Sequence, residues 1–163
     1  MDGTHVHLLL NHFPIIGTLI GTLLLIYSFL KKEIKIQQIS LAIIFVMAAL
    51  AIPVFLTGET AEEAVENLPG VMKSVIHEHE EASEVAFWVM MATGLLALIS
   101  IGMQMLETGF AKTLIIITMI LSIVSSGLMA RAGYLVGQIR HTEITGNQTA
   151  VQNTEQGCEE DND

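Results

Sequence analysis

The sequence predicts an all-α protein that folds as an antiparallel four-helix transmembrane bundle. Four long apolar segments are separated by polar stretches, and hydrophobic residues make up 52% of the 163 residues. Charged residues account for only 15%, against roughly 25% in soluble domains. Inside lipid every backbone amide needs a partner within the protein, so the apolar segments are expected to be helices.

The predicted helices belong to one transmembrane domain, residues 1–143. They cover about residues 8–30, 39–57, 85–105 and 113–136. A helix needs roughly 20 apolar residues to cross about 30 Å of hydrocarbon, and each segment meets this requirement. The glutamate-rich residues 58–84 are expected to form an outer acidic loop. The polar residues 144–163 are expected to form a disordered acidic tail.

Small residues predict where the helices pack closely. Gly17 and Gly21 are one helical turn apart, as are Gly133 and Gly137. This spacing lets two helix backbones approach each other in lipid. Pro53 lacks the N–H that a helix interior needs, so it is expected to kink the second helix or loosen its last turn.

Basic residues predict the orientation in the membrane. Lys31, Lys32 and Lys35 cluster between the first two helices, and short basic loops stay in the cytoplasm. Both termini and the acidic loop are therefore expected outside the inner (cytoplasmic) membrane, on its periplasmic side in a Gram-negative cell. No cleaved signal peptide is expected, because no positive residue precedes the first apolar run.

Charge and cysteine content exclude several classes of protein. The net charge is −10, with 17 acidic against 7 basic residues, so the chain lacks the basic surface that a nucleic-acid binder needs. Cys158 is the single cysteine, which rules out an internal disulfide. A covalently attached c-type haem is excluded as well, because the chain has no Cys-x-x-Cys-His sequence. The expected partners are the lipid bilayer, other membrane or redox proteins, and a second copy of the chain.

All six histidines fall on the outer side of this topology. They are His5, His7, His12, His77, His79 and His141. His77 and His79 are two residues apart, so on a helix they face nearly opposite ways. The face of His77 carries Glu80, Glu81 and Glu84; the face of His79 carries Ala82, Ser83 and Ala86. If the acidic face is solvated, His79 points into the bundle.

Three helices are each expected to bring one histidine to the same depth at the outer end of the bundle. These histidines are His12, His79 and His141, and the end of the second helix is expected to add Glu59 or Glu63. Imidazole suits Zn, Cu, Fe and Ni, and a carboxylate completes a harder site. One expected ligand is therefore a transition-metal ion.

A b-type haem is the other candidate cofactor, because two histidines suffice as its axial ligands. Arg131 or Arg140 would then lie near the propionates, and His7 is a further candidate ligand. Arg131 has two simpler interpretations, since it either snorkels to the headgroups or pairs with a buried carboxylate. A histidine at a membrane interface equally serves as a hydrogen-bonding residue without any ligand.

The stretch His7-Leu8-Leu9-Leu10-Asn11-His12-Phe13-Pro14 resembles the start of an uncharacterised bacterial membrane family, a four-helix domain of unknown function. In that family the first helix begins with two histidines five apart, the second followed by Phe-Pro. Leu8 stands where the family often has Pro, and Asn11 where it usually has Val. The resemblance covers about residues 5–143. It implies a four-helix membrane fold and candidate positions at His7 and His12, without an established activity.

Three functions fit these observations. The leading expectation is a non-enzymatic membrane protein that binds a metal ion or b-type haem at its outer end, for electron transfer or metal handling. The alternative is a non-catalytic structural or scaffold subunit of a larger membrane complex. An enzyme with a di-metal site ranks last, because no Glu-x-x-His pair repeats on two helices.

Overall fold

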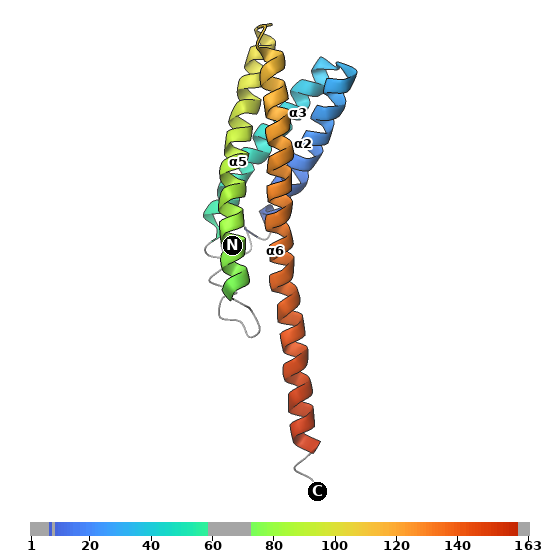
Figure 1. Cartoon of the computed structure of the whole chain (residues 1–163), viewed down its shortest axis with the longest axis vertical. Helices are drawn as coiled ribbons and strands as arrows, with labels where there is room; N and C mark the ends of the chain where they lie inside the picture. The colour runs from blue at the N-terminus through green and yellow to red at the C-terminus, as the bar shows by residue number, and fades with distance from the viewer. Residues whose placement is uncertain (1–6, 8, 59–72, 160–163) are drawn as a thin grey trace.

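The computed structural model describes residue 7, residues 9–58 and residues 73–159. The described residues form helices and turns, with no strand among them. The helices are α2 (His12–Lys31), α3 (Ile34–Leu56), α5 (Lys73–Met105) and α6 (Ala111–Glu159). Helix α2 packs against α3 and α6, and α5 packs against α3 and α6, so the four helices close into a ring. The predicted antiparallel four-helix bundle is confirmed (Figure 1).

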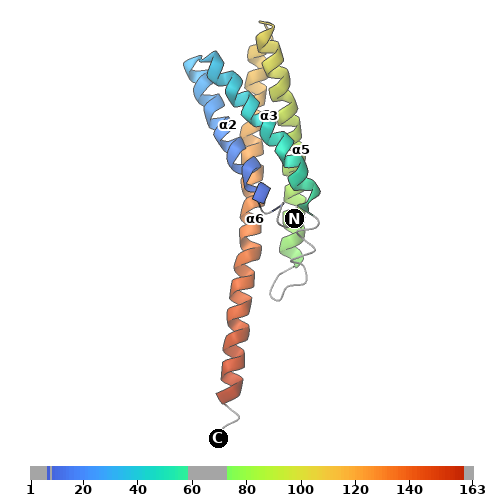
Figure 2. The same ribbon diagram turned by 180° about the vertical axis from the view of Figure 1, so that it is seen from behind.

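The two ends of the bundle differ in what they carry. Figures 1 and 2 show the start of α2, the end of α3 and the start of α5 gathered at one end. We call this the histidine end, because His7 and His79 lie there. The two short turns lie at the opposite end, which we call the lysine end for the lysines on these turns and at the helix ends beside them. These are Lys31, Lys32, Lys35 and Lys112.

Each of the four described helices contains a stretch long and apolar enough to cross a membrane. Large apolar side chains cover the outside of the bundle. Exposed examples are Leu19, Leu23, Phe45, Leu95, Ile120 and Val124. A monomeric soluble protein rarely exposes so much contiguous apolar surface, whereas in a bilayer these side chains face lipid. The chain is therefore described as a multi-pass membrane protein.

The turns at the lysine end are sharp because one residue in each adopts a left-handed backbone. Lys32 has φ 58° and Glu107 has φ 53°. After α2, the N–H of Glu33 donates to the carbonyl of Ser28 at 2.9 Å. This bond satisfies a carbonyl that the helix end would otherwise leave unpaired. The chain therefore reverses direction within a few residues and packs α3 against α2.

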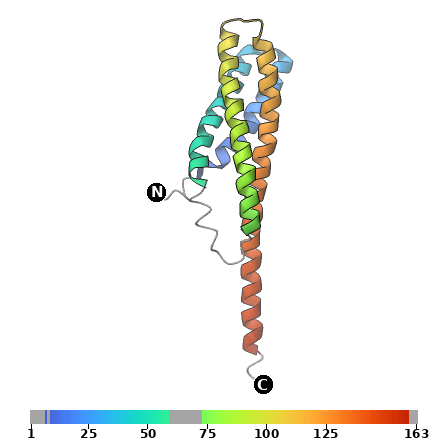
Figure 3. The same cartoon turned by 60° about the vertical axis from the view of Figure 1, so that its left-hand side comes forward.

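Two helices are longer than the sequence predicts. Helix α5 begins at Lys73, so the end of the expected acidic loop is helical. The buried side chains of Ile76 and Ala82 explain this, since they give the segment an inner face that packs in the bundle. Helix α6 continues to Glu159 and extends past the bundle (Figure 3). Residues 144–159, expected to be disordered, are thus helical, because a helix pairs its own backbone groups without a neighbouring element.

Close packing at Gly17 and Gly21 agrees with the prediction. A Cβ atom added to Gly17 would collide with the side chain of Met47 on α3. At Gly21 it would lie 2.9 Å from Cγ1 of Ile44. A larger residue at Gly17 would require the Met47 side chain to move aside, and one at Gly21 would require Ile44 to shift.

The prediction for the second glycine pair holds at one of its two positions. A Cβ atom on Gly133 would lie 3.3 Å from Cδ1 of Ile15, whereas no described atom lies within 4 Å of one on Gly137. Close packing at Gly137 is therefore wrong for the described residues, because this position lies beyond the part of α6 that α2 reaches. The tightest contact between α3 and α5 was not predicted: a Cβ on Gly94 would collide with that of Ala48.

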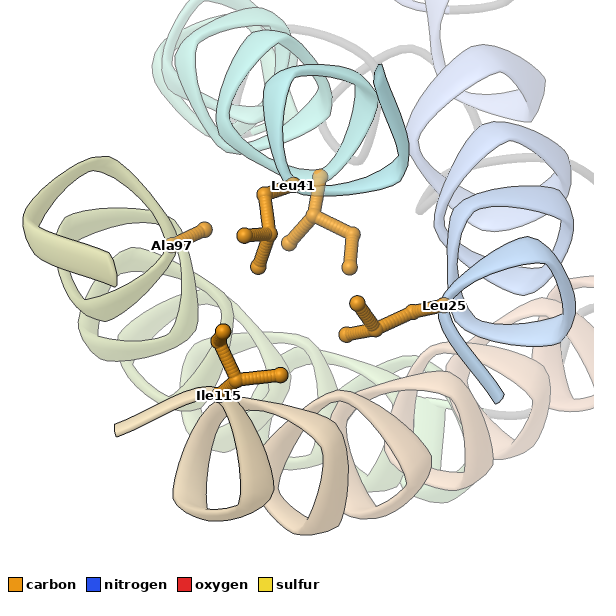
Figure 4. Packing of buried hydrophobic residues seen from close by; sticks show 5 residues of the cluster. Leu25, Leu41, Ala97 and Ile115 are labelled. Carbon is orange, nitrogen blue, oxygen red and sulfur yellow. The ribbon is translucent and has the colours of Figure 1, made fainter. Parts of the chain in front are cut away.

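The apolar core fills the bundle most fully near the lysine end. Leu25, Leu41, Ala97 and Ile115 come from four different helices and point toward one another (Figure 4). Ile44 completes this cluster. Fully buried residues gain the most from leaving water, so this cluster holds the lysine end together. A second cluster toward the histidine end combines three alanines with two methionines: Ala48, Ala51, Ala86, Met90 and Met129.

Candidate functional site

His7 connects the chain before α2 to the end of α3. Its half-buried ring places Nδ1 2.9 Å from the carbonyl oxygen of Val54. Val54 lies in the last turn of α3, where carbonyl groups lack a partner within the helix. The hydroxyl of Thr57 lies 3.5 Å from the same Nδ1. His7 thus provides a hydrogen-bond partner for a carbonyl group at the end of α3, and this bond holds the imidazole in place.

His79 points into the bundle from α5. Its half-buried ring places Nδ1 3.1 Å from the carbonyl oxygen of Ala132 on α6. The hydroxyl of Ser83, one turn further along α5, lies 3.3 Å from Nε2. The residues sharing its face, Ala82 and Ala86, are buried. The predicted inward orientation of His79 is confirmed.

His77 lies on the opposite, solvated face of α5. Its side chain is 71% exposed and lies 3.5 Å from the carboxylates of Glu80 and Glu81. These ion pairs are exposed and contribute little to stability. Two histidines only two residues apart therefore have different environments, as the helical period requires.

His7 and His79 are held in the same way at the histidine end. His7 contacts α3 through Val54, and His79 contacts α6 through Ala132. A carbonyl oxygen only accepts hydrogen bonds, so Nδ1 of each ring carries a proton and donates it. In the neutral imidazole the lone pair is then left on Nε2. This is the tautomer of metal-binding histidines, which almost always donate their second nitrogen to a carbonyl, carboxylate or water.

Asn11 lies one helical turn after His7. The backbone N–H of Asn11 donates to the carbonyl of His7 at 2.9 Å, and residues four apart share a helix face. The oxygen Oδ1 of Asn11 is buried and has no hydrogen-bond partner among the described residues. Buried polar atoms are nearly always paired. Oε1 of Gln104, at the lysine end, is likewise without a partner among the described residues.

Arg131 stands at the edge of the site. Its guanidinium lies 3.7 Å from the carboxylate of Glu78, and the two side chains are 60% and 57% exposed. Of the interpretations that the sequence left open, pairing is observed, although with a solvated carboxylate instead of a buried one. The pair ties α5 to α6 directly beside the His79–Ala132 contact, because Glu78 precedes His79 and Arg131 precedes Ala132.

The site lies at the level where candidate membrane spans begin and end: His7 precedes the first span, His12–Lys31, and His79 lies in the first turn of the third, Ile76–Met105. The 20 residues of α2 rise about 30 Å, which matches the hydrocarbon thickness. His7 precedes α2, so it lies beyond the hydrocarbon. An aromatic cluster supports this level: the rings of Phe55 and Phe87 stack at 4.2 Å, and Trp88 meets Phe87 edge-on at 5.4 Å. Aromatic side chains, Trp and Tyr above all, gather at membrane interfaces.

The remaining predicted site residues are only partly described. His12 begins α2 and is exposed. Glu59 and Glu63 lie outside the described residues, and so do the side chains of His141 and Arg140. Among the described residues, no three side chains of His, Cys, Asp or Glu gather where they could hold a metal ion. The convergence of His12, His79 and His141 therefore stays a prediction.

Sequence reasoning gave His7 less weight than it deserves. The ring of His7 contacts α3, whereas the sequence favours His12 because His12 lies deeper in the first apolar segment. The one-turn spacing of His7 and Asn11 is a signal that would have identified it, because it sets two polar side chains on one helix face.

Comparison with known proteins adds no identification: the chain matches no protein-family model, no curated protein and no solved structure. The geometry of the histidine end is therefore the basis for a functional proposal.

Proposed function

We propose that this multi-pass membrane protein binds a transition-metal centre at its histidine end, through Nε2 of His7 and Nε2 of His79. The observation that carries the proposal is the shared arrangement of the two rings. Each Nδ1 is held by a backbone carbonyl, at 2.9 Å for His7 and 3.1 Å for His79. Each Nε2 is thereby left with the lone pair, and at His79 a metal would displace the Ser83 hydroxyl that lies 3.3 Å from this nitrogen.

Imidazole nitrogen is a good ligand for Zn, Cu, Fe and Ni ions and for haem iron. The two rings come from the start of α2 and from α5, so a shared metal would link elements that are far apart in the sequence. Metal binding would also satisfy polar groups whose burial is otherwise costly. These features favour a binding role over a purely structural one.

Further ligands come from the residues that the sequence points to. A Cβ atom on Gly58 would lie 3.7 Å from Cε1 of His7. Glu59 follows Gly58 directly, so its carboxylate is a proposed third ligand, with Glu63 as the alternative. His12 and His141 are proposed as additional ligands if the centre is larger. A b-type haem would use the two imidazoles as axial ligands, with Arg131 or Arg140 near its propionates.

The position of the site suggests what the centre does. At the headgroup layer, a metal is accessible from the aqueous side and is close to partners that lie in or on the membrane. A haem or copper ion there would serve electron transfer, whereas a redox-inert ion would indicate metal handling. With the sequence-based orientation, this side is the periplasmic side of the inner membrane.

The test is purification of the full chain in mild detergent, followed by a visible spectrum and elemental analysis. A Soret band identifies haem, and stoichiometric metal without that band identifies an ion. His7→Ala and His79→Ala should each remove the bound species, and His77→Ala is the matched control because its ring is solvated. A wild-type protein without haem or metal would overturn the proposal and favour the scaffold role.

A further inference from the structure

The turn between α2 and α3 concentrates positive charge where two candidate membrane spans meet. Lys31 is the last residue of the first span, and Lys35 is the second residue of the next. Lys32 lies between them, so three lysines stand within five residues against one acidic residue, Glu33. All four residues are exposed. Three positive charges and one negative charge leave the turn with a clear positive excess at the boundary of the apolar spans.

Large apolar side chains flank these lysines. Leu30 is 73% exposed and Ile34 is 60% exposed, and they stand on either side of the pair Lys31 and Lys32 in the sequence. Lysine side chains beside apolar surface extend their charge toward the headgroups, while the apolar neighbours stay at the edge of the acyl chains. A lipid offers both an anionic headgroup and hydrocarbon, whereas a soluble anion offers only charge. The turn therefore fits a lipid better than a soluble anion.

Within the part of the chain that the structure describes, these lysines have no carboxylate partner. The ion pairs there join His77 to Glu80 and Glu81, and Arg131 to Glu78, all at the histidine end. The positive charge at the lysine end is thus not neutralised by the described residues, and it remains available to an anion outside the chain.

Lys32 keeps its side chain at a backbone position that favours glycine. It is the residue at which α2 ends, and its backbone is left-handed with φ 58°. Glycine is the usual residue at such a helix end, because a Cβ atom is disfavoured in this conformation. The exposed lysine makes no side-chain hydrogen bond or ion pair with the described residues. Backbone strain of this kind often accompanies function, so the charge of Lys32 points to a partner outside the bundle.

The second turn at the lysine end provides a comparison. Glu107 adopts the same left-handed backbone, with φ 53°, and the neighbouring Leu106 and Phe110 are each 74% exposed. This turn thus shares its backbone device and its exposed apolar side chains with the turn between α2 and α3. Its two charged residues, Glu107 and Lys112, cancel each other. The two turns differ in charge, and an anionic partner should distinguish them.

We infer that Lys31, Lys32 and Lys35 form a surface that retains anionic phospholipids, with Leu30 and Ile34 against the acyl chains. The attraction comes from the summed charge of the three lysines near the membrane surface. This surface lies at the opposite end of the bundle from the proposed metal centre, so the inference does not depend on that centre. In the predicted orientation this end faces the cytoplasm, where the leaflet carries the anionic lipids.

The experiment measures which lipid the folded full chain retains. The protein is immobilised in mixed micelles that contain equal amounts of phosphatidylglycerol and phosphatidylcholine, washed, and analysed for bound lipid by mass spectrometry. Wild type should retain phosphatidylglycerol preferentially, and added salt should weaken this preference through screening. Each lysine removed should lower the preference by up to about fivefold. Lys31→Gln/Lys32→Gln/Lys35→Gln should therefore abolish it, whereas Lys112→Gln, on the neutral turn, should retain it.

A second pair of variants separates the charge from the backbone. Lys32→Gly relieves the left-handed strain, so it should unfold at a higher temperature than wild type while its preference for phosphatidylglycerol falls. Glu107→Gly relieves the same strain at the neutral turn and should unfold at a higher temperature without any loss of preference. A position that serves only as a helix end would show the first effect at both turns and the second at neither.

Several results would overturn the inference. They are equal retention of the two lipids by wild type, a wild-type preference in the triple variant, and an equal loss of preference in Lys112→Gln. If the triple variant does not fold, Lys32→Gly decides, and an unchanged preference there counts against a lipid surface. An excess of soluble glycerol 3-phosphate should not displace phosphatidylglycerol. Displacement would mean that the lysines bind a soluble anion instead of a lipid.

Discussion

His79 on α5 donates from Nδ1 to the backbone carbonyl of Ala132 on α6, 3.1 Å away. This bond joins the acidic start of α5 to α6, the helix that runs beside it. It also determines which imidazole nitrogen remains available, and so it connects packing with the proposed chemistry.

Replacing His79 should lower stability even when no metal is present. His79→Ala loses a half-buried ring and its bond to Ala132, so the free energy of unfolding should fall by about 1–3 kcal/mol. His77→Ala should change it little, because that ring is 71% exposed. Thermal unfolding of both variants in the same detergent, with chelator present, measures the difference. Equal effects would mean that His79 does not face the bundle.

Gly94 should be the glycine least tolerant of substitution on α5. A Cβ there would collide with Ala48, so Gly94→Ala should cost about 1–3 kcal/mol through overpacking. Gly102, on the same helix, has no described atom within 4 Å of such a Cβ. Gly102→Ala should therefore be neutral or stabilising by roughly 0.5–1 kcal/mol, since alanine favours helix. The unfolding midpoints of the two variants test this difference. A Gly94→Ala variant as stable as wild type would contradict the packing of α3 on α5.

For the amide pair near the lysine end, removing both side chains should destabilise the protein less than removing one. Gln104 donates from Nε2 to Oε1 of Gln37 at 2.6 Å. Gln104→Leu leaves the buried oxygen of Gln37 without its donor and should cost about 1–3 kcal/mol. The double variant Gln37→Leu/Gln104→Leu removes both polar groups and should recover much of that loss. A double-mutant cycle of unfolding free energies tests this, and simple additivity would show that the amides do not interact.

Orientation is tested through cysteine labelling. If the turn with Lys31 to Lys35 faces the cytoplasm, Cys158 should react with an impermeant thiol reagent in intact spheroplasts. In a Cys158→Ser background, Thr108→Cys on the α5–α6 turn should react only after lysis. The reverse pattern would place the histidine end in the cytoplasm and move the proposed site to that side.

Much of the architecture was determined by the sequence alone. Four apolar runs of about 20 residues can satisfy their backbone groups in lipid only as helices, so helix number and antiparallel order followed from run length and from the short connections. The inward orientation of His79 followed from its two-residue offset from His77 on a 3.6-residue period. Close packing at Gly17 and Gly21 followed from their one-turn spacing.

Only the tertiary structure decided which polar groups meet across helices. Periodicity gives the face of one helix, but not the rotation and depth at which it packs on another, because these depend on how all the side chains between them fit. For that reason His7 contacts α3 while His12 is exposed, Gly94 meets Ala48, and the oxygen of Asn11 is buried without a partner among the described residues.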